Sequence, residues 1–157
     1  MDEDVEVVLA VLRAVEERDR AALLALLHED VEFHDAGSLP YGGVARGKAE
    51  AREESRPHET WIGTWGPLQP TPAERRMEPR VVASNGGEVV VEYRHRAASP
   101  AGERIDLPVL ALYEVRDGKL AQARMFHFDT AALTGFLARA QAGRFTGARG
   151  ISGPIIE

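Results

Sequence analysis

A chain of 157 residues, of which 44% are hydrophobic and 28% charged, is long enough to form one domain around a real core. Its formal net charge of −6 disfavours nucleic acid as a partner, because binding to phosphates depends on Lys and Arg. The apolar stretches are far shorter than the roughly 20 residues that cross a bilayer, and the acidic N-terminus lacks the basic segment of a signal peptide, so we expect a cytoplasmic protein with no membrane partner.

Two helices are expected near the N-terminus. Apolar residues recur at helical spacing from Val5 to Val15, and the acidic residues before them suit the positive end of a helix dipole. Asp19 can cap a second helix with a dense leucine face. Both helices therefore have an apolar side that must pack against another layer.

A strand, a loop and a third helix are predicted next. Residues 31–35 alternate apolar and polar side chains, which predicts a strand with Asp35 on its apolar face. Glycine and proline are frequent in residues 36–43, which indicates a loop, and residues 47–56 have the pattern of a helix. Residues 58–72 have no steady period, so we expect an irregular cover.

The remaining chain predicts an antiparallel meander followed by a helix. Turns rich in glycine separate four strand-like runs, which are residues 77–83, 88–97, 104–115 and 119–128. Residues 130–142 resume a helical period, with Thr130 as a cap and Gly143 as a stop. The order of elements predicts one α+β domain over residues 1–142, with helices on one face of a curved antiparallel sheet, and a glycine-rich tail over residues 143–157.

Two segments carry a family resemblance. Residues 31–40 (VEFHDAGSLP) resemble the catalytic-base segment of ketosteroid isomerases, and residues 126–133 (FHFDTAAL) resemble the last-strand-to-helix junction of SnoaL-like proteins, which include polyketide cyclases. The arrangement from Val5 to Ala142 resembles the nuclear transport factor 2-like fold. The resemblance implies a cone-shaped domain with a hydrophobic pocket, and a homodimer. Because this fold hosts isomerases, cyclases, dehydratases, epoxide hydrolases and binding modules, function must be argued from the site.

Asp35 matches the position of the isomerase base, which needs a carboxylate in a partly apolar site. The alternative is that Asp35 ends a strand and accepts backbone hydrogen bonds in the turn. The isomerases also use an oxyanion hole made by a tyrosine and a protonated carboxylic acid, but the matching positions are Val11 and Ala111. Neither side chain donates a hydrogen bond, so plain steroid isomerisation is not expected and another donor or another reaction is required.

The last predicted strand offers a second polar group. His127 and Asp129 are two residues apart and so point the same way on a strand, and the resemblance to SnoaL-like cyclases makes either one the nearest equivalent of an acid/base residue. Asp129 can instead cap the following helix, and His127 can instead be a satisfied core histidine. The catalytic candidates are therefore Asp35, His127 and Asp129.

Aromatic and polar side chains near these candidates are expected to contact substrate. They include two on one face of the central strand and two in the irregular cover, and the full set is Tyr41, Trp61, Trp65, Tyr93, His95 and Met125. The five histidines show no metal-binding spacing, and no nucleotide-binding motif occurs. We therefore expect neither a metal nor a cofactor.

Three functions remain open. The first is a cofactor-independent acid/base enzyme (an isomerase, cyclase or lyase) acting on a hydrophobic carbonyl compound, polycyclic ones included. In it Asp35 removes a proton while His127 or Tyr93 donates to the oxygen. The second is an epoxide hydrolase, whose candidate residues are Asp129, Asp106 and Arg94. The third is a non-catalytic module for binding a small molecule or for dimerisation.

Overall fold

A computed structural model describes residues 2–48 and 61–152. The helical elements are α1 (Glu3–Glu17), α2 (Arg20–Leu26), α4 (Trp61–Trp65), the 3₁₀ turn η1 (Gly66–Leu68), α5 (Pro72–Arg75) and α6 (Thr130–Ser152). The strands are β1 (Leu27–Asp35), β2 (Gly43–Arg46), β3 (Arg80–Asn85), β4 (Glu88–Ala98), β5 (Arg104–Arg116) and β6 (Lys119–His127). The helix predicted for residues 47–56 lies almost entirely outside the described residues.

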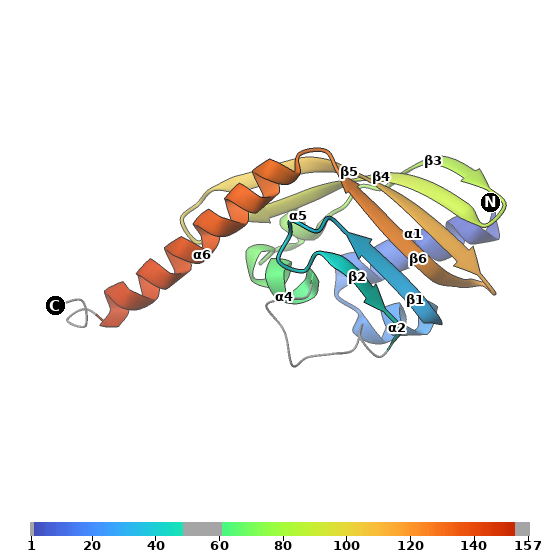
Figure 1. Ribbon diagram of the computed structural model, residues 1–157, viewed down its shortest axis with the longest axis horizontal. Coiled ribbons are helices and arrows are strands. Elements are labelled where there is room, and N and C mark those ends of the chain that lie inside the picture. Colours follow the sequence, from blue (N-terminus) through green and yellow to red (C-terminus); the bar gives the residue numbers. More distant parts are fainter. Residues whose placement is uncertain (1, 49–60, 153–157) are drawn as a thin grey trace.

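The described strands form one curved sheet in the order β2-β1-β6-β5-β4-β3, and α1 lies across one of its faces (Figure 1). This arrangement confirms the predicted α+β class. The expectation of a wholly antiparallel sheet is wrong, because β1 runs parallel to β6. That pairing joins segments far apart in the sequence, which local alternation does not reveal. The strand β2 was also missed, since its four residues are all exposed and show no alternation.

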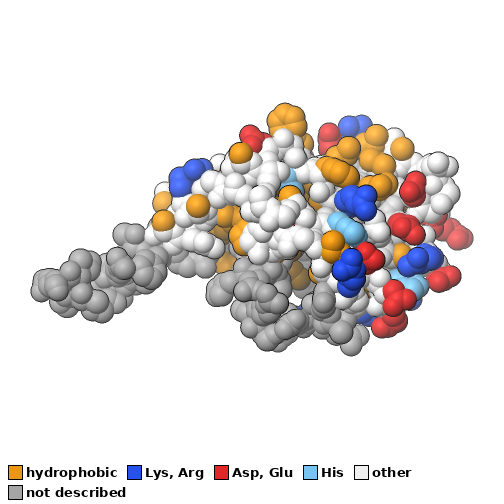
Figure 2. Space-filling model, viewed as in Figure 1, with side chains coloured by type: hydrophobic (Ala, Val, Ile, Leu, Met, Phe, Trp, Pro, Cys, Tyr) orange, Lys and Arg blue, Asp and Glu red, His pale blue; other side chains and the backbone are white. Residues whose placement is uncertain are grey.

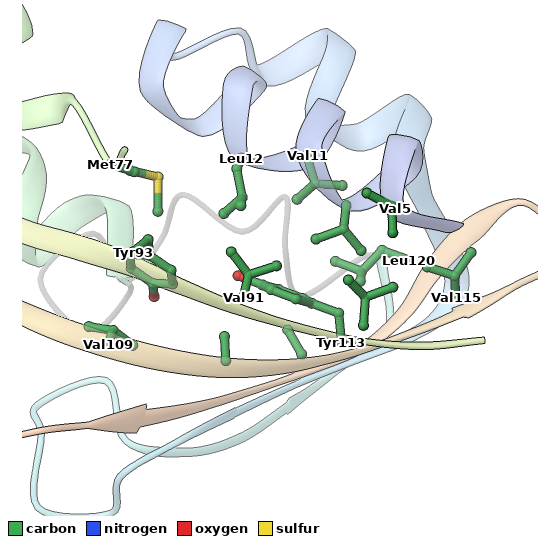
Figure 3. Packing of buried hydrophobic residues seen from close by; sticks show 14 of the residues in the cluster. Val5, Val11, Leu12, Met77, Val91, Tyr93, Val109, Tyr113, Val115 and Leu120 are labelled. Carbon is green, nitrogen blue, oxygen red and sulfur yellow. The ribbon is translucent and has the colours of Figure 1, made fainter. Parts of the chain in front are cut away.

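Strand alternation determines which side chains face α1. In β4 every second residue is buried, namely Val89, Val91, Tyr93, His95 and Ala97. The matching face of β5 presents Val109, Ala111 and Tyr113. The first cluster of the core combines these three residues with Val89, Val91 and Tyr93 of β4 and with Val5, Val8, Val11 and Leu12 of α1 (Figure 3). The inner face of the sheet is therefore apolar apart from a few phenol and imidazole groups.

A second cluster forms where α6 packs on the other end of the sheet. Leu133, Phe136 and Leu137 of α6 are buried against Trp65 and Ala97. The rings of Trp65 and Phe136 stack with centroids 6.2 Å apart. The short helical turns α4 and η1, where the sequence predicted an irregular cover, thus bring Trp65 into the core.

Helix ends follow local side-chain chemistry. The predicted cap of α2 is confirmed, since Asp19 accepts a hydrogen bond from the Ala22 N–H at 3.0 Å. The predicted stop at Gly143 is wrong, because α6 continues to Ser152 and extends away from the sheet (Figure 1). One glycine inside a helix costs only about 1 kcal/mol, so it does not end a helix by itself. No helix in the described part of the chain combines the length and apolar character of a membrane span.

The burial of α6 predicts a large effect of a small change. Leu133 is 0% exposed in the second cluster, so Leu133→Ala should lower the free energy of unfolding by about 2–5 kcal/mol in a urea titration. Ile62 is 54% exposed, so the matched change Ile62→Ala should alter the free energy of unfolding by no more than about 0.5 kcal/mol. Equal effects of the two changes would contradict the packing of α6 described above.

Candidate acid/base site

Asp35 is the last residue of β1, and its carboxyl group is poorly hydrated. Its Oδ1 is shielded from solvent and has no hydrogen-bond partner among the described residues. Burial raises the pKa of Asp35 to about 7, because a poorly hydrated carboxylate is unfavourable. The alternative that Asp35 merely accepts hydrogen bonds in the following turn leaves this oxygen unexplained. A buried polar atom without a partner is uncommon, and here it marks a place where a ligand atom can bind.

All three tyrosines of the chain lie around Asp35. Burial is the main reason that the pKa values of Tyr41, Tyr93 and Tyr113 lie above the usual value, and the nearby Asp35 carboxylate raises them further. The phenols therefore remain protonated at neutral pH, as hydrogen-bond donors. Figure 3 shows Tyr93 and Tyr113 between α1 and the sheet. Tyr113 was not predicted, although its alternation with Val109 and Ala111 on β5 is a signal that could have found it.

The two residues that stand where a ketosteroid isomerase has its oxyanion donors, Val11 and Ala111, are buried. Val11 and Ala111 are both buried in the first cluster, 4% and 1% exposed. Their side chains leave the Asp35 region without the donors of a ketosteroid isomerase. Tyr93 and Tyr113 supply phenol groups there instead, from β4 and β5 rather than from the first helix. The site has hydrogen-bond donors, but a different arrangement of them.

A pair of imidazoles forms the second polar part of the site. The rings of His95 and His127 are 6.3 Å apart, in an edge-on arrangement. His127 has no partner for either ring nitrogen among the described residues, and His95 has none for Nε2. Burial lowers the pKa of both, that of His95 to about 3 with a further contribution from His127. Both rings are therefore neutral at pH 7, and His127 is not a satisfied core histidine.

Sheet register connects the two parts. Tyr93 is opposite Val109, and Val109 is opposite His127, so Tyr93 and His127 flank one residue in a row across the inner face. Tyr93 is also close enough to Asp35 for its charge to be felt. Tyr93 thus links the acid group to the imidazole pair on the inner face.

Aromatic rings connect the imidazoles to the tyrosines. The Trp65 ring lies edge-on to His95 with centroids 4.1 Å apart, and the Trp61 ring is 6.3 Å from His95. The Trp65 Nε1–H donates to the Tyr41 hydroxyl at 2.8 Å. Met125 packs against the first cluster. The fold therefore brings Tyr41, Trp61, Trp65 and His95 together, while Tyr93 and Met125 lie in or against the first cluster.

Asp129 is separate from this group. It is exposed, and its Oδ1 accepts a hydrogen bond from the Ala132 N–H at 2.9 Å. Asp129 is thus the cap of α6, in place of the predicted Thr130, and its carboxylate is already used in this contact. The structure supports the capping alternative for this residue and brings only Asp35 and His127 of the three catalytic candidates to the inner face.

The residues predicted for epoxide hydrolysis are not assembled. Arg94 alternates with the buried Tyr93 and His95, so it lies on the opposite face of β4. There Arg94 Nε donates to Asp106 Oδ1 at 2.8 Å, and Arg96 contacts the other oxygen of Asp106 at 3.2 Å. Within the described ranges, no group of three or more potential metal-ligating side chains is close enough to hold a metal ion.

Comparisons with known proteins identify the family. A model of the SnoaL-like domain matches residues 8–123. The chain therefore belongs to the SnoaL-like domain family. No curated protein sequence matches it.

Solved structures show the same fold. TerC, crystallised with polyporic acid, is 24% identical with a TM-score of 0.72, and the match covers 87% of this chain and 99% of TerC. A candidate polyketide cyclase from Xanthomonas campestris is 22% identical with a TM-score of 0.63, covering 88% and 96%. SalBIII, an epoxide hydrolase/cyclase-like enzyme of pyran ring formation in salinomycin, is 20% identical with a TM-score of 0.59, covering 81% and 92%. The shared fold is that of NTF2-like proteins.

The raised pKa of Asp35 predicts how stability depends on pH. Because the folded protein holds the proton more tightly than the unfolded chain, stability should fall as the pH rises from about 4 to about 7. Asp35→Asn removes this loss, so its free energy of unfolding relative to the wild type should increase over that range. The increase is at most about 4 kcal/mol, because folding raises the pKa of Asp35 from 3.8 to about 7 and each pKa unit corresponds to about 1.4 kcal/mol.

The matched control is Asp30→Asn, an exposed aspartate of the same strand. It should show no such pH-dependent gain in urea titrations at several pH values. A constant difference between Asp35→Asn and the wild type would mean that the carboxyl group is well hydrated.

Proposed function

We propose that this protein is a cofactor-independent acid/base enzyme, an isomerase, cyclase or lyase that acts on a hydrophobic carbonyl compound, polycyclic ones included. The observation that carries the proposal is the buried Oδ1 of Asp35, which has no partner among the described residues and lies near three neutral phenols. A carboxyl group with a pKa of about 7 exchanges protons readily at neutral pH.

The surroundings favour an apolar substrate. The rings of Trp61 and Trp65 lie against His95, and Met125 packs against the first cluster, so the polar groups have apolar surroundings. The polar groups are few, and the phenols and imidazoles among them are neutral, which suits a ligand with one or two oxygens on an apolar body. The similarity to the candidate polyketide cyclase supports a hydrophobic carbonyl compound as the class of substrate.

The alternatives are less well supported. Arg94 and Asp106, which were predicted for epoxide hydrolysis, pair with each other on the outer face and so are separate from Asp35. SalBIII, by contrast, is named for epoxide chemistry. A non-catalytic binding module would use the same unpartnered atoms for affinity alone. Turnover distinguishes this module from the proposed enzyme.

A compound screen tests the proposal. Polycyclic ketones, phenols and epoxides are first assayed for stabilisation of the protein, and each compound that binds is then assayed for conversion. Asp35→Asn should lower turnover of a responding ketone by about 10²–10⁴-fold, because it removes proton transfer by this carboxyl group. Asp129→Asn should leave turnover unchanged, since asparagine caps a helix as well as aspartate does. Full activity of the Asp35 variant would remove Asp35 from the mechanism.

We also propose that the outer face of the sheet binds a second copy of this chain. Leu110 and Phe126 are opposite each other on β5 and β6 and are 43% and 53% exposed. Apolar side chains gather over the sheet on this face (Figure 2). Nearby, Arg94 and Asp106 pair with one another, so the face presents both signs of charge and is compatible with a symmetric partner.

The outer-face proposal predicts a change in mass. Phe126→Glu should convert a dimer into a monomer in sedimentation equilibrium, because it places charge within an apolar contact. Ile62→Glu, at another exposed apolar residue outside this face, should remain dimeric. A monomeric wild type would refute the proposal.

A further inference from the structure

The surroundings of Asp35 favour its protonated form. Within the described residues, the groups that face it are the phenols of Tyr41, Tyr93 and Tyr113, and none of these is a cation. Its Oδ1 accepts no hydrogen bond from them. Nothing in this part of the chain compensates a negative charge on the carboxyl group, and burial alone accounts for the rise of its pKa to about 7.

The surroundings of His127 favour its neutral form. The titratable group that faces it is the imidazole of His95, which cannot stabilise a positive charge. Both ring nitrogens of His127 lack a partner among the described residues, so no carboxylate holds an imidazolium there. Burial lowers its pKa. The surroundings thus favour a protonated carboxyl group at Asp35 and a neutral imidazole at His127.

Building on the proposed function, we propose that the site takes an uncharged ketone, that protonated Asp35 donates to its oxygen, and that neutral His127 accepts the proton from the adjacent carbon. This reverses the role of base that the sequence predicts for Asp35. The neutral phenols are further donors on the Asp35 side.

The step balances without any co-reactant. The C–H bond next to the carbonyl breaks and its proton goes to a ring nitrogen of His127, while its electron pair forms a carbon–carbon double bond. The π pair of the carbonyl bonds to the proton released by Asp35. The products are the enol, the Asp35 carboxylate and the His127 imidazolium. Return of a proton to a different carbon gives an isomer, and attack of the enol carbon on a second carbonyl of the substrate closes a ring.

The same geometry selects against anions. A carboxylate ligand would bring a negative charge to a site that has no described cation beside it, and it would bind only with a large desolvation penalty. An uncharged oxygen, by contrast, accepts the proton of Asp35. The substrate class is therefore an uncharged ketone, while carboxylic acids that are ionised at neutral pH are excluded.

Binding of 1-tetralone, a small uncharged bicyclic ketone, tests the first half of the proposal. Its affinity for the wild type should weaken as the pH rises through about 7, because Asp35 then loses the proton it donates. Its affinity for Asp35→Asn should not change with pH, since the amide keeps an N–H donor. The anion 1,2,3,4-tetrahydronaphthalene-1-carboxylate should bind at least about tenfold more weakly than the ketone. Equal or tighter binding of the anion, or no binding of the ketone, would overturn the proposal.

Exchange of the hydrogens next to the carbonyl of 1-tetralone with deuterium from the solvent, followed by NMR, tests the second half. Both Asp35→Asn and His127→Gln should slow exchange by about 10²–10⁴-fold. The exchange that remains in His127→Gln should fall as the pH rises through about 7, because it depends on the acid form of Asp35. The exchange that remains in Asp35→Asn should rise through the pKa of His127 and then stay level.

If the residual exchange instead rises with pH in His127→Gln and falls with pH in Asp35→Asn, Asp35 is the base. That result overturns this inference while leaving the proposed enzyme in place. If the protein does not speed exchange above the solvent rate, the proposed function fails as well. Asp30→Asn is the control for both measurements and should match the wild type.

Discussion

The account depends on the poor hydration of one carboxyl group. Asp35 lies at the end of a strand that is paired on both sides, so its position is fixed by the sheet rather than by its own contacts. Its Oδ1 has no described partner, and the phenols around it are neutral. A carboxyl group in such a place gives up its proton near neutral pH, which is the property that general acid/base catalysis needs. A carboxyl group whose pKa is shifted by burial is typical of functional sites.

The rest of the fold positions this group. Strand alternation places Tyr93, Tyr113 and His127 on the face covered by α1, and the same rule places Arg94 on the outside. The short helical turns after residue 60 bring Trp65 against His95. Two separate apolar clusters hold these elements, one under α1 and one under α6. Tyr93 and Tyr113 belong to the first cluster, while Tyr41 and Trp61 pack against the second.

Much of this arrangement could be predicted from the sequence because it is local. Periodicity indicated the helices and most strands, and alternation correctly placed Asp35, Tyr93 and His95 on the inner face. The parallel pairing of β1 with β6 could not be predicted, because it depends on contacts between distant segments. Asp129 illustrates a different limit, since a helix cap and a catalytic acid have the same local sequence. The grouping of the three tyrosines around Asp35 required the register of β1, β4 and β5 in space.

The most direct measurement of the central claim is the protonation of Asp35 itself. The carbon NMR signal of its carboxyl group, assigned by comparison with Asp35→Asn, can be followed as the pH is changed. The account predicts a midpoint near 7, because burial disfavours the charged form. A midpoint close to the usual value of an aspartate, about 4, would show that the group is hydrated or neutralised, and would contradict the account.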